Sequence, residues 1–242
     1  VPASLISEEL AGLYGSQVLA ELSEIISLYD VYENGAEFLT EGSSGDYIPA
    51  NLKYKQSASL INKEARFMFS KSPDFWVDSE FTFEDKEADE TTLAAKADDA
   101  KQIDILQKLV DNVLGKNNMR KKLLQAAKDC FIGKRVAVIL NFSEDEKSKG
   151  ISVSFIPSLE FAYDVDPDDS DRLIKLVAFY NINDSKNKAE QRLYKKKYEM
   201  RDDGFCYVEE NIYDGVGNVI EVKLEATRTL FEYIPGYVIV ND

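Results

Sequence analysis

The chain has 242 residues, 44% of them apolar, and carries 29 basic against 44 acidic side chains, a net charge of −15. A surface this acidic repels a phosphate backbone, which argues against tight nonspecific binding of nucleic acid by the whole protein. The sequence contains no histidine, which excludes Ser–His and Cys–His nucleophiles and any zinc site that uses histidine. We therefore expect a protein that is not an enzyme, with no catalytic, cofactor-binding or metal-ligating residues.

Residues 1–132 are predicted to be mainly helical. Apolar residues from Val18 to Tyr32 recur at a spacing near 3.6, which predicts a helix that ends at Asn34-Gly35. Further helices are expected over residues 51–69, 89–114 and 117–133. On these three helices the residues expected to be buried are Leu60, Ile61, Ala65, Met68, Phe69, Leu93, Ala97, Ala100, Ile103, Leu106, Val110, Val113, Leu123, Leu124, Ala127 and Phe131.

One strand is expected within this helical part. Phe75, Val77, Phe81 and Phe83 alternate with more polar neighbours, which is the period of a strand, so we predict a strand near residues 75–83.

Residues 133–242 are predicted to be rich in antiparallel strands. Apolar and polar residues alternate there, and short polar turns separate the alternating segments. The expected strands cover residues 136–142, 151–155, 159–165, 173–182, 192–200, 205–213 and 219–227. Helices first and strands afterwards predict an α+β fold, and we expect both parts to form one folded unit.

Charge is distributed unevenly along the chain. The first 52 residues hold nine acids and no base, whereas residues 186–201 hold seven bases and two acids. Opposite charges on one molecule suit head-to-tail contacts between copies. Within the basic stretch, Lys195, Lys196 and Lys197 are candidates for a contact with another subunit or with DNA; the alternative is an exposed or edge strand protected by its charge.

Asp74, Glu84 and Lys86 match the residue types of a Mg²⁺-dependent nuclease signature, in which two carboxylates hold the metal and the lysine supports the attacking water. A continuous strand would separate Asp74 from Glu84 by about 33 Å, too far for a shared metal. This nuclease remains an alternative function. A second alternative is an acidic module that binds a basic partner through residues 1–52.

Five aspartates between Asp164 and Asp171 resemble a calcium-binding loop. Counted from Asp164, however, an EF-hand needs Gly and Glu where this chain has Asp169 and Lys175. We therefore interpret the segment as an acidic turn between two strands.

Several segments, taken in order, resemble the N-terminal region of tailed-bacteriophage portal proteins. Residues 28–35 are similar to the Tyr-rich, Asn-Gly-terminated end of that family's opening helices. Residues 65–73 are similar to a helix end that leads through Pro-Pro into a strand, with Asp74 in place of the second proline. The similarity continues at residues 128–138, a helix-glycine-strand junction, and then at residues 151–163, 177–180 and 233–242.

The resemblance implies a structural role. Portal proteins form a ring, typically of twelve copies, at one vertex of the capsid, through which double-stranded DNA is packaged and ejected. The implied partners are further copies of the chain, the terminase, capsid proteins, head-tail adaptor proteins and the DNA, with no membrane and no cofactor. The implied location is the virion, and the host cytoplasm during assembly.

By the same resemblance the chain corresponds to the wing of the portal. We expect it to end before the channel-lining stem helix, so no DNA-facing or terminase-contacting residues of the family are transferred to it.

Overall fold

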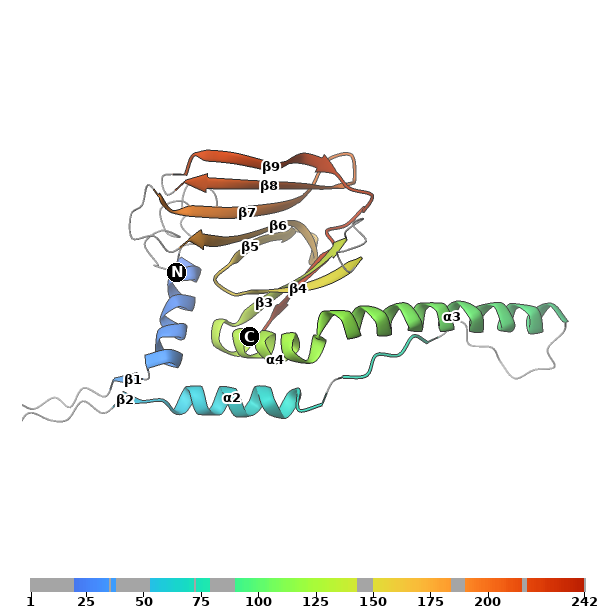
Figure 1. The fold of residues 1–242 in the computed structure, drawn as a ribbon, viewed down its shortest axis with the longest axis horizontal. Coiled ribbons are helices and arrows are strands. Elements are labelled where there is room, and N and C mark those ends of the chain that lie inside the picture. Colours follow the sequence, from blue (N-terminus) through green and yellow to red (C-terminus); the bar gives the residue numbers. More distant parts are fainter. Residues whose placement is uncertain are drawn as a thin grey trace, which may run out of the picture.

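The computed structural model describes residues 20–34, 36–37, 53–71, 73–78, 90–142, 150–183, 190–214 and 217–241. It confirms the α+β class, because helices in the first half precede two antiparallel sheets in the second. In Figure 1 the helices α2 and α4 lie below the sheets, and the long helix α3 projects to one side.

The described helices follow the predicted order. A helix over residues 20–34 ends at Asn34 as predicted, and its Leu22 and Ile25 are buried. The other helices are α2 (Gln56–Met68), α3 (Glu90–Asn117) and α4 (Met119–Gly133). None of these described helices is both long and apolar enough to cross a lipid bilayer.

The helix predicted over residues 89–114 ends later than expected, because Gly115 does not stop it. The helix α3 continues to Asn117, and the break comes at Asn118, whose backbone is left-handed with φ 52°. The Asn117 side chain donates to the carbonyls of Val113 and Ile151 and accepts from the Val153 amide, so it ties the end of α3 to the sheet. A helix tolerates a glycine where a tertiary contact holds the following turn.

The predicted buried faces of the helices need correction. Leu60 and Met68 on α2 are 59% and 56% exposed, and Leu106 on α3 is 47% exposed. The helix α2 packs on α4 along one side, and α3 projects beyond the sheets (Figure 1). On α4 the most buried residues are Met119, Ala126, Asp129, Ile132 and Gly133, whereas Leu123, Leu124, Ala127 and Phe131 are half-buried. The side chains of Leu93 and Ala97 lie outside the described residues.

The predicted strand near residues 75–83 is not formed in its described part. Residues 73–78 are extended but belong to no sheet. Gln107 on α3 takes the place of a neighbouring strand, because its side-chain oxygen accepts from the Val77 amide at 2.8 Å and its nitrogen donates to the Phe75 carbonyl at 2.9 Å. Residues 79–83 lie outside the described residues.

Two antiparallel sheets form the second half. The five-stranded sheet is a meander of neighbouring strands, and β10 joins β3 and β4 in a three-stranded sheet with the order β10-β3-β4. The strands are β3 (Arg135–Phe142), β4 (Ile151–Pro157), β5 (Phe161–Asp166), β6 (Asp169–Asn183), β7 (Arg192–Met200), β8 (Cys206–Asp214), β9 (Val219–Arg228) and β10 (Gly236–Val240). The predicted strands are confirmed, while β10 and the short pair β1 (Ala36–Glu37) and β2 (Lys53–Tyr54) were not predicted.

The two faces of the five-stranded sheet are covered by different elements. The main core lies between the sheets and comprises Ala137, Ile139, Phe161, Leu173, Leu176, Tyr198, Cys206 and Ile234. On the opposite face, Leu22 of the first helix packs against Ala162, Val177 and Phe179. The five-stranded sheet therefore has a hydrophobic cluster on each face, one shared with the three-stranded sheet and one shared with the first helix.

Candidate functional site

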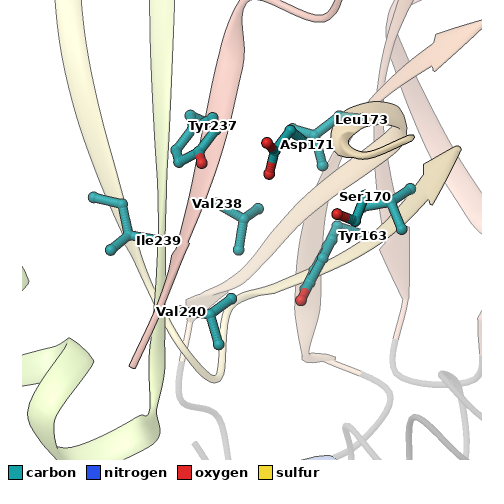
Figure 2. A pocket seen from close by; sticks show the side chains of 9 residues that line it. Tyr163, Ser170, Asp171, Leu173, Tyr237, Val238, Ile239 and Val240 are labelled. Atoms are coloured by element: carbon teal, nitrogen blue, oxygen red, sulfur yellow. The ribbon is translucent and has the colours of Figure 1, made fainter. Parts of the chain in front are cut away.

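An open cleft lies where an edge of the three-stranded sheet faces an edge of the five-stranded sheet. It has a volume of about 560 Å³, and we call it the sheet cleft. Figure 2 shows β10 on one side and the hairpin of β5 and β6 on the other. The lining residues are Tyr163, Val165, Ser170, Asp171, Leu173, Tyr237, Val238, Ile239 and Val240. The lining is therefore mixed, with five aliphatic side chains, three hydroxyl groups and one carboxylate.

The free edge of β10 supplies main-chain polar groups to the sheet cleft. Within the described chain β10 pairs with β3 alone. At the two ends of this pairing, the Leu140 amide donates to the Pro235 carbonyl, and the Asn241 amide donates to the carbonyl of Lys134, just before β3. Bonded and outward-facing residues alternate in an antiparallel ladder. The N–H and C=O groups of Val238 and Val240 therefore point away from β3, toward the cleft.

The buried Arg135 does not line the cleft but lies next to two residues that do, because it is opposite Val240 in the sheet and stacks on Tyr163. Its guanidinium lies over the rings of Phe161 and Tyr163, 4.8 and 5.7 Å from the ring centroids. Its charge is balanced by Glu21 of the first helix, at 2.8 Å. A buried charge is costly unless it is paired, so Arg135 fixes the first helix and the β5 edge together.

The rim of the cleft is acidic. We call residues 164–171, the tip of the β5–β6 hairpin, the acidic hairpin. Two of its carboxylates accept hydrogen bonds from backbone amides: Asp166 from the amide of Asp168, and Asp169 from the amide of Asp171. Asp166 pairs with Arg172 at 3.6 Å. Asp168, Asp169 and Asp171 form no ion pair with any described residue. Among the described residues there is no group of three or more side chains placed to hold a metal ion.

A cluster of hydrogen-bonded polar side chains lies where α4 meets the turn between β4 and β5. Tyr29 donates to the Asp129 carboxylate at 3.2 Å, and the buried Ser158 hydroxyl lies 3.2 Å from the Asp129 carbonyl. Burial raises the pKa of Asp129, and burial together with the Asp129 charge raises the pKa of Glu160. These groups join the first helix to α4, which is a structural role.

The three candidate lysines lie in the middle of the five-stranded sheet, and β7 is not an edge strand. Lys196 pairs with Glu210 at 2.8 Å, and Lys197 pairs with Glu209 at 3.2 Å, both acids being on β8. Lys195 lies over the Tyr213 ring at 5.4 Å, and burial lowers its pKa, with a smaller effect from Lys197. The structure thus gives two of the lysines acidic partners within the chain, and their contact with a subunit or DNA stays a prediction.

The residues of the two alternative functions lie largely outside the described part. Asp74 is exposed in the extended segment, whereas Glu84 and Lys86 fall outside the described residues. Of residues 1–52, the structure describes 20–34 and 36–37. The described residues therefore form neither a nuclease site nor a binding site for a basic partner.

A second surface was missed by the sequence analysis. The described residues 53–71 hold five bases and one acid, and residues 116–128 hold five bases and no acid. These segments meet where α2 packs on α4, and the exposed bases Lys63, Arg66, Lys71, Arg120 and Lys121 form what we call the basic surface. Local charge counts reveal each segment, but their meeting depends on the packing of the two helices.

Large apolar side chains are exposed on α2, on the segment that follows it and on α3. Phe67 on α2 and Trp76 in the extended segment are each 82% exposed. The other members are Leu60, Met68, Phe75, Ile105, Leu106 and Leu109.

We found no family model and no curated protein sequence that matches the chain. These surfaces and the sheet cleft are the features from which we argue function.

Proposed function

We propose that this chain is the wing of a tailed-bacteriophage portal, a ring at one capsid vertex through which DNA enters and leaves. The ordered similarity of residues 28–35, 65–73, 128–138 and 151–163 to that family supports the proposal. The local structure agrees with the motifs: α4 ends at Gly133 before β3 begins, and α2 ends before Pro73.

The observation that carries the proposal is the presence of two chemically different contact surfaces on one chain. The helices expose bases and large apolar side chains, whereas the sheet cleft has an acidic rim. Contiguous apolar surface on a folded chain marks a site of association. Contacts between two different surfaces generate closed rings when the rotation between copies closes.

Such a ring acts through its shape and its assembly. The channel has to let DNA pass without holding it, and the net charge of −15 disfavours a tight hold on phosphates. In this role the terminase, the capsid and the adaptor proteins bind the outer surfaces of the ring, and the chain's side chains make and break no covalent bonds.

Electron microscopy and mass measurement of the complete gene product test the proposal. We expect ring-shaped particles with a central hole and a mass that is a multiple of the subunit mass. A single species with the mass of one chain at all concentrations would refute the proposed function.

A further inference from the structure

We propose that the basic surface of one copy docks on the acidic hairpin and the mouth of the sheet cleft of a second copy. This inference rests on the proposed function, because it names the two halves of the contact that joins neighbouring subunits. Three properties support it: complementary charge, complementary apolar surface and the directions in which the two halves face.

The first property is a set of exposed positive side chains that have no ion partner among the described residues of a strongly acidic protein. Arg66, Lys71 and Lys121 are exposed and form no ion pair with any described residue. Arg120 donates to the carbonyl of Ser70, which holds the start of α4 beside the end of α2. The first turn of α4, with Arg120 and Lys121, therefore lies beside the end of α2 and the neighbouring Lys71.

The exposed side of α2 adds an apolar component. Leu60, Lys63 and Phe67 follow the i, i+3, i+7 spacing of one helix face, opposite the buried Ala65. The phenyl ring of Phe67 is 82% exposed. The phosphates on the outside of duplex DNA offer no apolar surface to cover such a ring, so the surface fits a protein partner better than the backbone of a duplex.

The sheet cleft offers the matching groups. Asp168 and Asp171 are exposed acids without an ion partner among the described residues, and the outward carbonyls of Val238 and Val240 are further acceptors. Lysine and arginine side chains are donors without an acceptor, so they complement this rim. The aliphatic side chains of the lining and the volume of about 560 Å³ leave room for an aromatic ring such as that of Phe67.

The two halves cannot meet within one copy. Met68 and Phe69 at the end of α2 line a pocket with Ile239 and Val240 of β10. The face of α2 that carries Leu60, Lys63 and Phe67, however, is opposite the buried Ala65, and α2 packs on α4 (Figure 1), so that face points away from the sheet cleft. A contact between them has to join two copies. It leaves the sheet cleft of one copy and the basic surface of the other copy free for further contacts. That is the geometry of a heterologous contact, which continues until a ring closes.

Charge reversal on each half tests the contact. The first variant, Arg66→Glu/Lys121→Glu, exchanges one charge in the last turn of α2 and one in the first turn of α4, so the opposite effects on the two helix dipoles offset each other. The second variant, Asp168→Lys/Asp171→Lys, removes no hydrogen bond that either side chain accepts among the described residues. The control matched in charge, Lys101→Glu/Lys108→Glu, makes the same charge change on the exposed face of α3; it also breaks two exposed ion pairs, with Asp98 and Asp104, which contribute little to stability.

Association of the intact protein and each variant is measured by sedimentation over a range of concentrations at low salt. We expect each double variant to associate roughly tenfold more weakly or worse, as for close charge pairs at other interfaces. An equimolar mixture of the two variants, and one chain carrying all four changes, should recover association, because the reversed charges again match. The control should associate as the wild type does.

Three results would overturn the inference. The first is wild-type protein that stays monomeric at about 1 mM and low salt, where screening is weak. The second is a mixture that stays monomeric although the wild type associates; rings in the microscope would then leave the proposed function standing while refuting this contact. The third is Arg66→Glu/Lys121→Glu losing affinity for a 20-base-pair DNA duplex with self-association unchanged, which would assign the basic surface to nucleic acid.

Discussion

Gly133, at the end of α4, is the position where the packing of the chain makes its sharpest prediction. A Cβ atom there would lie 2.2 Å from the Ser158 hydroxyl oxygen, 2.4 Å from the Ser158 Cβ and 3.1 Å from a ring carbon of Tyr29. Ser158 is fully buried, and its hydroxyl lies between the carbonyls of Asp129 and Arg135. It therefore has no free space into which it can move.

The Gly133→Ala substitution should destabilise the protein. Overpacking of this kind costs about 1–3 kcal/mol, and a contact at 2.2 Å places the expected cost in the upper part of that range. Replacing glycine by alanine in a helix by itself raises the free energy of unfolding by about 0.5–1 kcal/mol, which offsets part of this cost. The net loss of unfolding free energy should be about 1–2 kcal/mol, measured by urea unfolding followed by circular dichroism.

The same substitution at Gly115 is the matched control. Gly115 also lies within a helix, but nothing would come within 4 Å of a new Cβ atom there. Gly115→Ala should therefore stabilise the protein by about 0.5–1 kcal/mol. Adding Ser158→Gly should remove most of the clash, and a double-mutant cycle should show that coupling. Equal stability of the two alanine variants would refute the reasoning.

Three further predictions concern the helices and the sheet. Gln107→Ala should speed hydrogen exchange at the Val77 amide at least tenfold, since that amide loses its acceptor; unchanged exchange would contradict the bond. The pKa of Asp129 is raised in the folded state, so its protonation favours folding, and the wild type should gain stability relative to Asp129→Asn as the pH falls from 8 toward the ordinary value of 3.8. A constant or opposite difference in urea unfolding would disprove that sign. A double-mutant cycle on Lys196 and Glu210 should give a coupling of about 1 kcal/mol that weakens with salt; zero coupling at low salt would show that the pair is not formed.

The strands were predictable because their signal is local. Alternating residues from Val136 onward and polar turns between strands specify extended chain that reverses direction, and neighbouring strands then pair in sequence order. The same alternation failed at residues 73–78, because a strand needs a neighbour for its main chain. Gln107 supplies those hydrogen bonds from a helix instead.

The candidate surfaces were less predictable because they join distant parts of the chain. The acidic hairpin is continuous in sequence and was recognised as a turn. The sheet cleft needs β10 beside β3, more than ninety residues earlier in the chain, and no local pattern reports that pairing. Lys196 illustrates the same limit, since its partner Glu210 becomes a neighbour through the register of β7 against β8.

The amino-acid sequence by itself determined the type and order of the longer helices and of β3 to β9, because hydrophobic period, turn residues and helix ends act over a few neighbouring residues. Tertiary structure decided which faces are covered: Ala65 is buried under α4, whereas Phe67, two residues later, is almost fully exposed. Burial depends on what packs against an element, and that partner is chosen by contacts between segments far apart in the chain. The basic surface and the sheet cleft, which we propose to meet between copies, are both formed by such contacts between distant segments.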